Sequence, residues 1–433
     1  MVRFESQMGR VAADVLSEIS GQLAPEITRM RELVQAGGYA DDRASVNLVD
    51  DSALLDEVLS LAERYQDVDA LVVIGIGGSN LGTMAVQEAI QGRLGGKAAG
   101  TQVFYADTVD ALSMGRLIEQ VQTFAKDGKR VLLNGISKSG GTIETTANFF
   151  ALLDAVEQAG GSAKDSVVLT TVEGSKLWQY GQEQGIPCLR MPETVGGRYS
   201  VFSAVGLFPL AVAGIDVRAL VKGAKAMRDA CLATSLDENP AAMSAVVLYA
   251  HNQAGIPIHD TFLFASDLES VGKWYRQLMG ESIGKEHNRA GEVVHAGMTP
   301  TVSMGSTDLH SVVQLYLDGP NDRVTTFVRV RALPALTVPN RPEVGALVGD
   351  IAGKPMATIM DAILDGTMIA YEKAERPFMV LELDAMNEES IGAFLQLKML
   401  EMMYLGHLLG VNPFDQPAVE KYKVETKRLL QVA

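Results

Sequence analysis

Short apolar runs alternate with longer stretches of helical periodicity through the first half of the chain. Five of the runs are predicted to be buried strands, at residues 69–75, 102–106, 130–136, 166–171 and 187–190. Helices are predicted between them, at residues 81–92, 110–124 and 142–159. Apolar strands separated by helices are typical of a parallel sheet that is covered on both faces.

The alternation resumes in the second half, after a stretch at residues 200–253 that reads helical throughout. Further strands are predicted at residues 260–265, 298–303, 324–330 and 378–383, and a final helix begins at Pro417. The pattern predicts an α/β fold with two doubly wound, mostly parallel three-layer αβα sandwiches and helical extensions at both ends. We expect a helical region at 1–54, sandwiches at 55–195 and 196–412 (the second with the helical bridge), and a C-terminal helix at 413–433.

Composition narrows the class of protein. The 433 residues carry a net charge of −16, which disfavours non-specific binding of nucleic acid. No uninterrupted apolar run of 18 residues predicts a membrane span, and the first residues lack the pattern of a secretory signal. The two cysteines, Cys188 and Cys231, form neither a disulfide framework nor a metal-type pair. We therefore expect a soluble, cytoplasmic protein.

Candidate chemistry lies first in the turn after the third predicted strand. This turn contains Ser137, Lys138, Ser139, two glycines and Thr142, directly before a helix. A helix N-terminus offers unpaired N–H groups, and small residues and hydroxyls let an anion approach closely. A simple helix cap would explain one hydroxyl but explains three less well. We favour a phosphate-binding loop.

A second turn, at residues 73–82, also leads from a strand into a helix. Its glycines resemble a dinucleotide fingerprint, but the third glycine of that pattern is replaced by Asn80. The first acid at a second strand end, Asp107, lies further downstream than a ribose contact requires. Gly78 and Ser79 are therefore interpreted as further phosphate contacts, placed beside Ser137 by neighbouring strands.

The chain resembles the glucose-6-phosphate isomerase family between about residues 72 and 423. The resemblance is carried by six blocks in order: GIGGSNLG, SKSGGTIET, GGRYSVFSAVGLFP, GESIGKEHN, STDLHS and LLGVNPFDQPAVEKYK. It implies two sugar-isomerase domains. It also implies reversible conversion of glucose 6-phosphate to fructose 6-phosphate, in glycolysis and gluconeogenesis, through ring opening and a cis-enediol.

The resemblance also implies roles for individual residues. Glu281 matches the base that moves a proton between C1 and C2, although by itself it is an unremarkable helix-end acid beside Lys285. Arg198 matches the cation that stabilises the enediol, and it would otherwise be an ordinary partner for carboxylates. Gln277 and Gln416 match glutamines that line the sugar.

Ring opening needs an acid and a base. His310 matches the family's ring-opening histidine, and Lys423 matches its lysine at the ring oxygen. His287 remains a competitor because it lies near Glu281 in sequence. Glu144, in the first turn of the phosphate-loop helix, is interpreted as a partner for a cation such as Lys423.

The remaining expectations concern partners and alternatives. No metal or other cofactor is implied, because no metal-ligand spacing is present and the enediol route does not need one. The resemblance implies a homodimer in which His310 enters the site of the partner subunit. A second interpretation, a related enzyme that also accepts mannose 6-phosphate, is left open by the sequence. A non-catalytic phosphosugar sensor is disfavoured because Glu281, His310 and Lys423 are all present.

Overall fold

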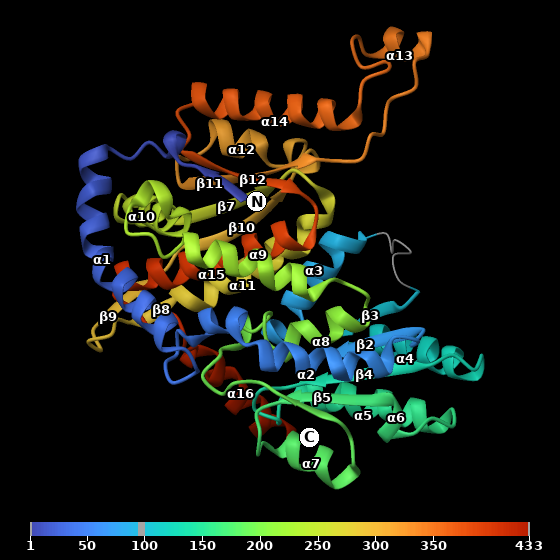
Figure 1. The fold of residues 1–433 in the computed structure, drawn as a ribbon. Helices are drawn as coiled ribbons and strands as arrows, with labels where there is room; N and C mark the ends of the chain where they lie inside the picture. Colours follow the sequence, from blue (N-terminus) through green and yellow to red (C-terminus); the bar gives the residue numbers. More distant parts are fainter. Residues whose placement is uncertain (1, 94–99, 432–433) are drawn as a thin grey trace.

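The computed structural model describes residues 2–93 and 100–431 and contains two five-stranded sheets (Figure 1). The first sheet has the strand order β3-β2-β4-β5-β6 and is parallel throughout. All five predicted strands are confirmed, each within one residue at either end. They are β2 (Ala70–Ile74), β3 (Gln102–Ala106), β4 (Val131–Ile136), β5 (Val167–Thr171) and β6 (Cys188–Arg190).

Alternate side chains of this sheet enter two separate cores. Leu71 and Val73 belong to the large central core, whereas Val72 and Ile74 pack into a second core on the opposite face. This explains why the strands read as continuous apolar runs and confirms the three-layer arrangement. The accompanying helices are α2 (Ser52–Ala62), α3 (Leu81–Gln91), α4 (Ala111–Lys126), α5 (Ile143–Gln158), α6 (Ala163–Ser166), α7 (Lys176–Gln184) and α8 (Ala204–Val212).

The second sheet has the order β1-β12-β11-β7-β10, and only β1 runs antiparallel to its neighbour. Its strands are β1 (Val2–Glu5), β7 (Ile258–Leu263), β10 (Thr299–Met304), β11 (Arg323–Ala332) and β12 (Phe378–Ala385). One face packs an aromatic core that includes Phe262, Phe327 and Tyr371, and the other face joins the central core. The predicted mostly parallel second sandwich is confirmed.

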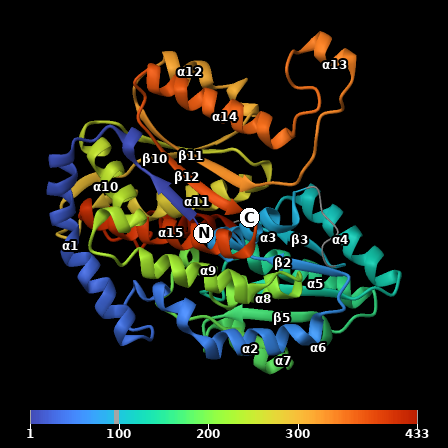
Figure 2. The ribbon, with the colours of Figure 1, turned by 45° about the horizontal axis from the view of Figure 1, so that its top comes forward.

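The central core lies between the two sheets, where helices from both halves of the chain meet (Figure 2). The fully buried Leu278 and Phe394 lie in this core, on two helices that contact each other. The remaining helices are α1 (Ala13–Ala36), α9 (Val217–Ala230), α10 (Pro240–Gln253), α11 (Glu269–Ile283), α12 (Val313–Asp318), α13 (Pro342–Leu347), α14 (Met356–Lys373), α15 (Glu388–Leu408) and α16 (Pro417–Leu430).

Three details differ from the sequence-based expectation. The N-terminal region is not purely helical, because β1 forms an edge of the second sheet and pairs with residues 380–383. The stretch at 200–253 is divided into three helices, with Gly214 in a left-handed conformation after the first. A short hairpin, β8 (Lys285–His287) and β9 (Val293–Ala296), follows α11 and was not predicted.

One segment projects from the body of the molecule. It runs between β11 and α14, carries α13 and stands clear of the second sheet in both views (Figures 1 and 2). Leu336, Leu347 and Val348 are exposed on it. None of the helices within residues 2–93 and 100–431 combines the length and the apolar character that a membrane crossing requires.

Candidate active site

The two polar turns of the first sheet lie side by side at its carboxyl edge. β2 and β4 are paired neighbours, and Ser79 and Ser137 belong to the turns that follow them. A Cβ added at Gly75 would lie 2.8 Å from the Cβ of Ser79 and 3.2 Å from the main-chain oxygen of Ile136. The two turns therefore meet where ligands of doubly wound sheets bind.

The turn before α5 has the properties of an anion-binding loop. Ser137 is buried, and its Oγ lies 3.1 Å from Oγ1 of Thr142. Thr142 is the N-cap residue of α5, but its side chain makes no capping hydrogen bond. The ordinary helix-cap interpretation is therefore wrong for this hydroxyl. Ser139 is exposed, and its Oγ accepts a 3.4 Å hydrogen bond from the N–H of Gly141.

Lys138 adds a cation to this loop. Burial lowers the pKa of its ammonium group, whereas the nearby carboxylates of Glu193 and Asp42 act in the opposite direction. The lysine is half-buried and makes no hydrogen bond or ion pair with its side chain to any residue that the structure describes. A phosphate group at the loop would give this cation a partner.

The glycine turn after β2 lies against residues 197–198 and the side chain of Gln277. A Cβ at Gly78 would lie only 2.1 Å from the main-chain carbon of Gly197, and 2.5 Å from the nitrogen of Arg198. Gly77 has φ of +60°, and a Cβ there would lie 2.8 Å from Nε2 of Gln277. Only glycine permits this approach, so the turn after β2 and the segment that carries Arg198 are held in direct contact.

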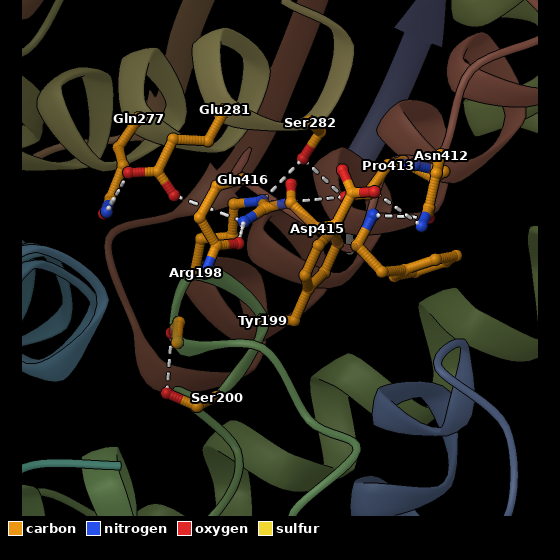
Figure 3. Close-up of polar contacts among 12 residues, drawn as sticks. Arg198, Tyr199, Ser200, Gln277, Glu281, Ser282, Asn412, Pro413, Asp415 and Gln416 are labelled. Atoms are coloured by element: carbon orange, nitrogen blue, oxygen red, sulfur yellow. Dashed lines mark hydrogen bonds and ion pairs between the residues drawn. The ribbon is translucent and has the colours of Figure 1, made fainter. Parts of the chain in front are cut away.

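Arg198 is the centre of the hydrogen-bonding network (Figure 3). Its guanidinium is almost completely buried, and all five of its N–H donors have acceptors. The acceptors are Oγ of Ser282 (2.9 Å), Oε2 of Glu281 (3.2 Å), Oε1 of Gln416 (2.8 Å) and the main-chain oxygens of Pro413 (2.5 Å) and Asp415 (3.1 Å). The guanidinium is thus a fixed positive charge in a buried position.

The carboxylate of Glu281 lies beside this charge, on the last turn of α11. Its second oxygen accepts a 3.1 Å hydrogen bond from Nε2 of Gln277. The side chain keeps 31% of its surface exposed and lines a cavity of about 800 Å³, together with Gln416 and His287. Oε1 of Gln277 is buried without a hydrogen-bond partner among the described residues. A carboxylate that is oriented by two donors and still accessible can take and return a proton.

His310 and Lys423 are not brought to Glu281 within one chain. His310 is exposed after β10, and its ring makes no hydrogen bond or ion pair to any residue in the described parts of the chain. Nζ of Lys423 lies 2.7 Å from Oε1 of Glu420, one turn away on α16, so the expected pairing with Glu144 is wrong. The cavity beside Glu281 is lined by His287, and neither His310 nor Lys423 is among its lining residues.

Several residues of the network were not identified from sequence. Ser282 accepts from Arg198 and contacts the Tyr199 hydroxyl at 2.8 Å, and both side chains are buried. Lys285 bonds the main-chain oxygen of Glu281 at 2.8 Å rather than its carboxylate. Ser282 and Tyr199 are sequence neighbours of Glu281 and Arg198, and Lys285 lies in the same GESIGKEHN block as Glu281, so proximity in sequence was the available signal.

No group of three or more His, Cys, Asp and Glu side chains that could hold a metal ion occurs within residues 2–93 and 100–431. The chemistry that the geometry does support is proton transfer by a carboxylate beside a fixed cation and an anion-binding loop. Such chemistry, on a pair of doubly wound sheets, is that of the phosphosugar isomerases, and this is the class that the fold and the site define.

Comparison with known proteins narrows the class to a family. The family model described as phosphoglucose isomerase matches residues 59–330. A probable glucose-6-phosphate isomerase of Haloarcula marismortui is 33% identical over 96% of this chain and 90% of its own. A glucose-6-phosphate isomerase of Thermus thermophilus is 32% identical over 94% of both chains. The chain belongs to the phosphoglucose isomerase family.

Solved structures share the fold. A protein from Thermus thermophilus, described as hypothetical, superposes with a TM-score of 0.87 at 30% identity, covering 99% of this chain and 100% of its own. A glucose-6-phosphate isomerase from Chlamydia trachomatis superposes with a TM-score of 0.86 at 21% identity, over 100% of this chain and 88% of its own. The second likeness shows the shared fold.

Proposed function

We propose that this chain interconverts glucose 6-phosphate and fructose 6-phosphate, with Glu281 moving a proton between C1 and C2 of the open-chain sugar. The observation that carries the proposal is the Glu281 carboxylate, held at 3.2 Å by the buried Arg198 and open to a cavity. A carboxylate can take the proton from one carbon and return it to the other on the same face of a cis-enediol.

Arg198 acts as the fixed cation for this step. Negative charge develops on the enediol oxygens, and a cation in a poorly hydrated cleft stabilises it much more than one in water. All five donors of Arg198 are already engaged, so its charge acts without any rearrangement of the side chain. Gln277 and Gln416 are then placed to contact the sugar hydroxyls. The unpaired buried Oε1 of Gln277 supports a role as acceptor.

The phosphate group occupies the turns at the carboxyl edge of the first sheet. The hydroxyls of Ser79, Ser137, Ser139 and Thr142 and the amine of Lys138 supply donors, and Gly78 allows close approach of the main chain. The uncapped N-terminus of α5 supports this placement. Phosphate binding here fixes the far end of the sugar, so that C1 and C2 are presented to Glu281.

Ring opening is assigned to His310 and Lys423, with the protein acting as a homodimer. The exposed His310 ring, which has no partner among the described residues, supports its entry into a second subunit's site. Leu336, Leu347 and Val348 are exposed on the projecting segment and support an interface, because apolar surface that gathers on one segment marks interaction sites. A cytoplasmic location is proposed, in keeping with the role of the family in glycolysis.

A coupled assay tests the activity directly. Fructose 6-phosphate is supplied, a metal chelator is present for the isomerase step, and formation of glucose 6-phosphate is followed. We expect steady conversion that persists with the chelator and falls at least about a hundredfold in Glu281→Gln. Absence of conversion by correctly folded wild-type protein would reject the proposed function.

A further inference from the structure

Lys285 is a buried cation just beyond the catalytic helix, and the proposed chemistry does not use it. Only 5% of its side-chain surface is exposed. Its Nζ donates to three oxygens, which matches the three N–H bonds of an ammonium group. They are the main-chain oxygen of Glu281 (2.8 Å), Oδ1 of Asp415 (2.9 Å) and the main-chain oxygen of Asp415.

These contacts join two parts of the site that are far apart in sequence. Glu281 lies on the last turn of α11, whereas Asp415 belongs to the loop at residues 412–416 that leads into α16. The main-chain oxygen of Asp415 accepts hydrogen bonds from both Lys285 and Arg198, so two cations hold the same peptide group. Figure 3 shows this loop and Arg198. Gln416 follows directly, and its own side chain accepts from Arg198.

The loop depends on such anchors. Asp415 is half-exposed, and besides Lys285 its carboxylate accepts from the side chain of Asn412 at 3.0 Å. Gln416 is the N-cap residue of α16 but makes no side-chain capping bond, so its main chain depends on the preceding peptide and its side chain on the hydrogen bond from Arg198. Burial of Lys285 also has a free-energy cost, which its hydrogen bonds offset only when the loop is in place.

We propose that Lys285 is a positioning residue that clamps the loop at residues 412–416 to the end of α11. The clamp sets the place of Gln416 relative to Glu281 and Arg198. This inference rests on the proposed function. The proposed phosphate-binding turns follow β2 and β4 of the first sheet, and no hydrogen bond or ion pair joins them to Lys285 among the described residues. Loss of the clamp should therefore lower kcat and leave phosphate recognition unchanged. A displacement of about 1 Å at a positioned group can cost on the order of a hundredfold in rate.

The test compares Lys285→Met with Lys273→Met. Lys273 lies on α11, the helix that precedes Lys285, and its ammonium group pairs on the surface with Glu269, so its replacement should leave kcat unchanged. For Lys285→Met we expect kcat to fall about 10- to 100-fold. KM, and the inhibition constant of inorganic phosphate, should stay within about twofold of wild type. Unchanged kcat in a folded Lys285→Met protein would overturn the proposal.

A double-mutant cycle with Gln416→Ala separates positioning from a general loss of structure. If Lys285 acts through Gln416, its replacement should lower kcat much less once Gln416 is absent. Full additivity of the two effects would overturn the proposal. If Lys285→Met does not fold, Asp415→Ala takes its place in the same cycle, because it removes the charged partner but keeps both main-chain contacts. Glu281→Gln, assayed in parallel, shows whether the proposed function itself fails.

Discussion

The two halves of the proposed catalytic machinery differ sharply in how they are held. Glu281 and Arg198 lie in a dense network, in which every N–H of the arginine has an acceptor and two elements far apart in sequence are joined. His310 is exposed and Lys423 is half-buried, and neither side chain makes a hydrogen bond or ion pair with Glu281 in the described parts of the chain. Proton transfer needs fixed geometry, and one chain by itself holds Glu281 against Arg198. We propose that a second subunit completes the ring-opening half.

Removal of the base should have the largest effect. Glu281→Gln keeps the shape and the contacts with Gln277 and Arg198 but cannot accept a proton. We expect kcat to fall by about 10²- to 10⁴-fold, while KM and inhibition by inorganic phosphate change little. Steady-state kinetics on fructose 6-phosphate measure this. Near-normal kcat would reject Glu281 as the base. The distinction between a proton-transfer half and a ring-opening half would then have no support.

The ring-opening half should behave differently from the base. His310→Ala and Lys423→Ala should slow turnover of cyclic substrate by about 10- to 100-fold, since general acid and base assistance is lost. Exchange of the C1 proton in open-chain substrate should fall much less, because Glu281 and Arg198 remain in place. Proton exchange followed by NMR gives the comparison. Equal losses in both reactions would show that these residues are not specific to ring opening. His287→Ala is the matched control, because His287 is the competing histidine.

The phosphate loop should affect binding rather than chemistry. Replacing both Ser137 and Thr142 by Ala removes two hydroxyls that lie 3.1 Å apart. Hydrogen bonds to charged groups contribute roughly 1.5–3 kcal/mol each, so KM and the inhibition constant of inorganic phosphate should both rise at least about tenfold. A change confined to kcat would mean that the phosphate group binds elsewhere. Ser113→Ala, on exposed α4, is a suitable control.

The smallest effect on rate is expected from a change at Glu26, a buried carboxylate whose partner Arg43 packs on the loop at residues 412–416. Burial by itself raises the pKa of Glu26, but hydrogen bonds from His407 and Arg43 lower it to about 2. The Arg43 guanidinium also lies over the ring of Phe414, 5.4 Å from its centroid, in the clamped loop. Because the folded-state pKa lies below the ordinary 4.5, this carboxylate stabilises the fold above about pH 4.5, and the stabilisation disappears toward pH 2.

Glu26→Gln should therefore lower the free energy of unfolding at pH 7 by at most roughly 3 kcal/mol and leave kcat unchanged. The difference between variant and wild type should shrink as the pH falls from about 4.5 toward 2. Urea unfolding at several pH values measures it. A large fall in kcat at neutral pH, with folding intact, would show that the scaffold and the catalytic half are not separable.

More of the fold than of the site could be predicted from the sequence. Both sheets were predicted because strands buried on two faces read as apolar runs. The exception, β1, has only four residues, and its partner β12 lies nearly the whole chain away, so no local pattern marks the pairing. Among site residues, the hydroxyl turns followed from strand ends, but Glu281 was selected only through the family motif. Contacts such as Lys285 with Asp415 join residues 130 positions apart and depend on packing that no local pattern contains.

The division of the site between two chains is the central claim, and complementation tests it most directly. Inactive Glu281→Gln and His310→Ala chains are mixed, unfolded and refolded together, and mass measurement confirms that mixed dimers form. In each mixed dimer one site carries both defects, and the other combines an intact Glu281 with an intact His310. About half of the dimers are mixed, so roughly a quarter of wild-type activity should return. If mixed dimers are present and no activity returns, His310 does not act across the interface.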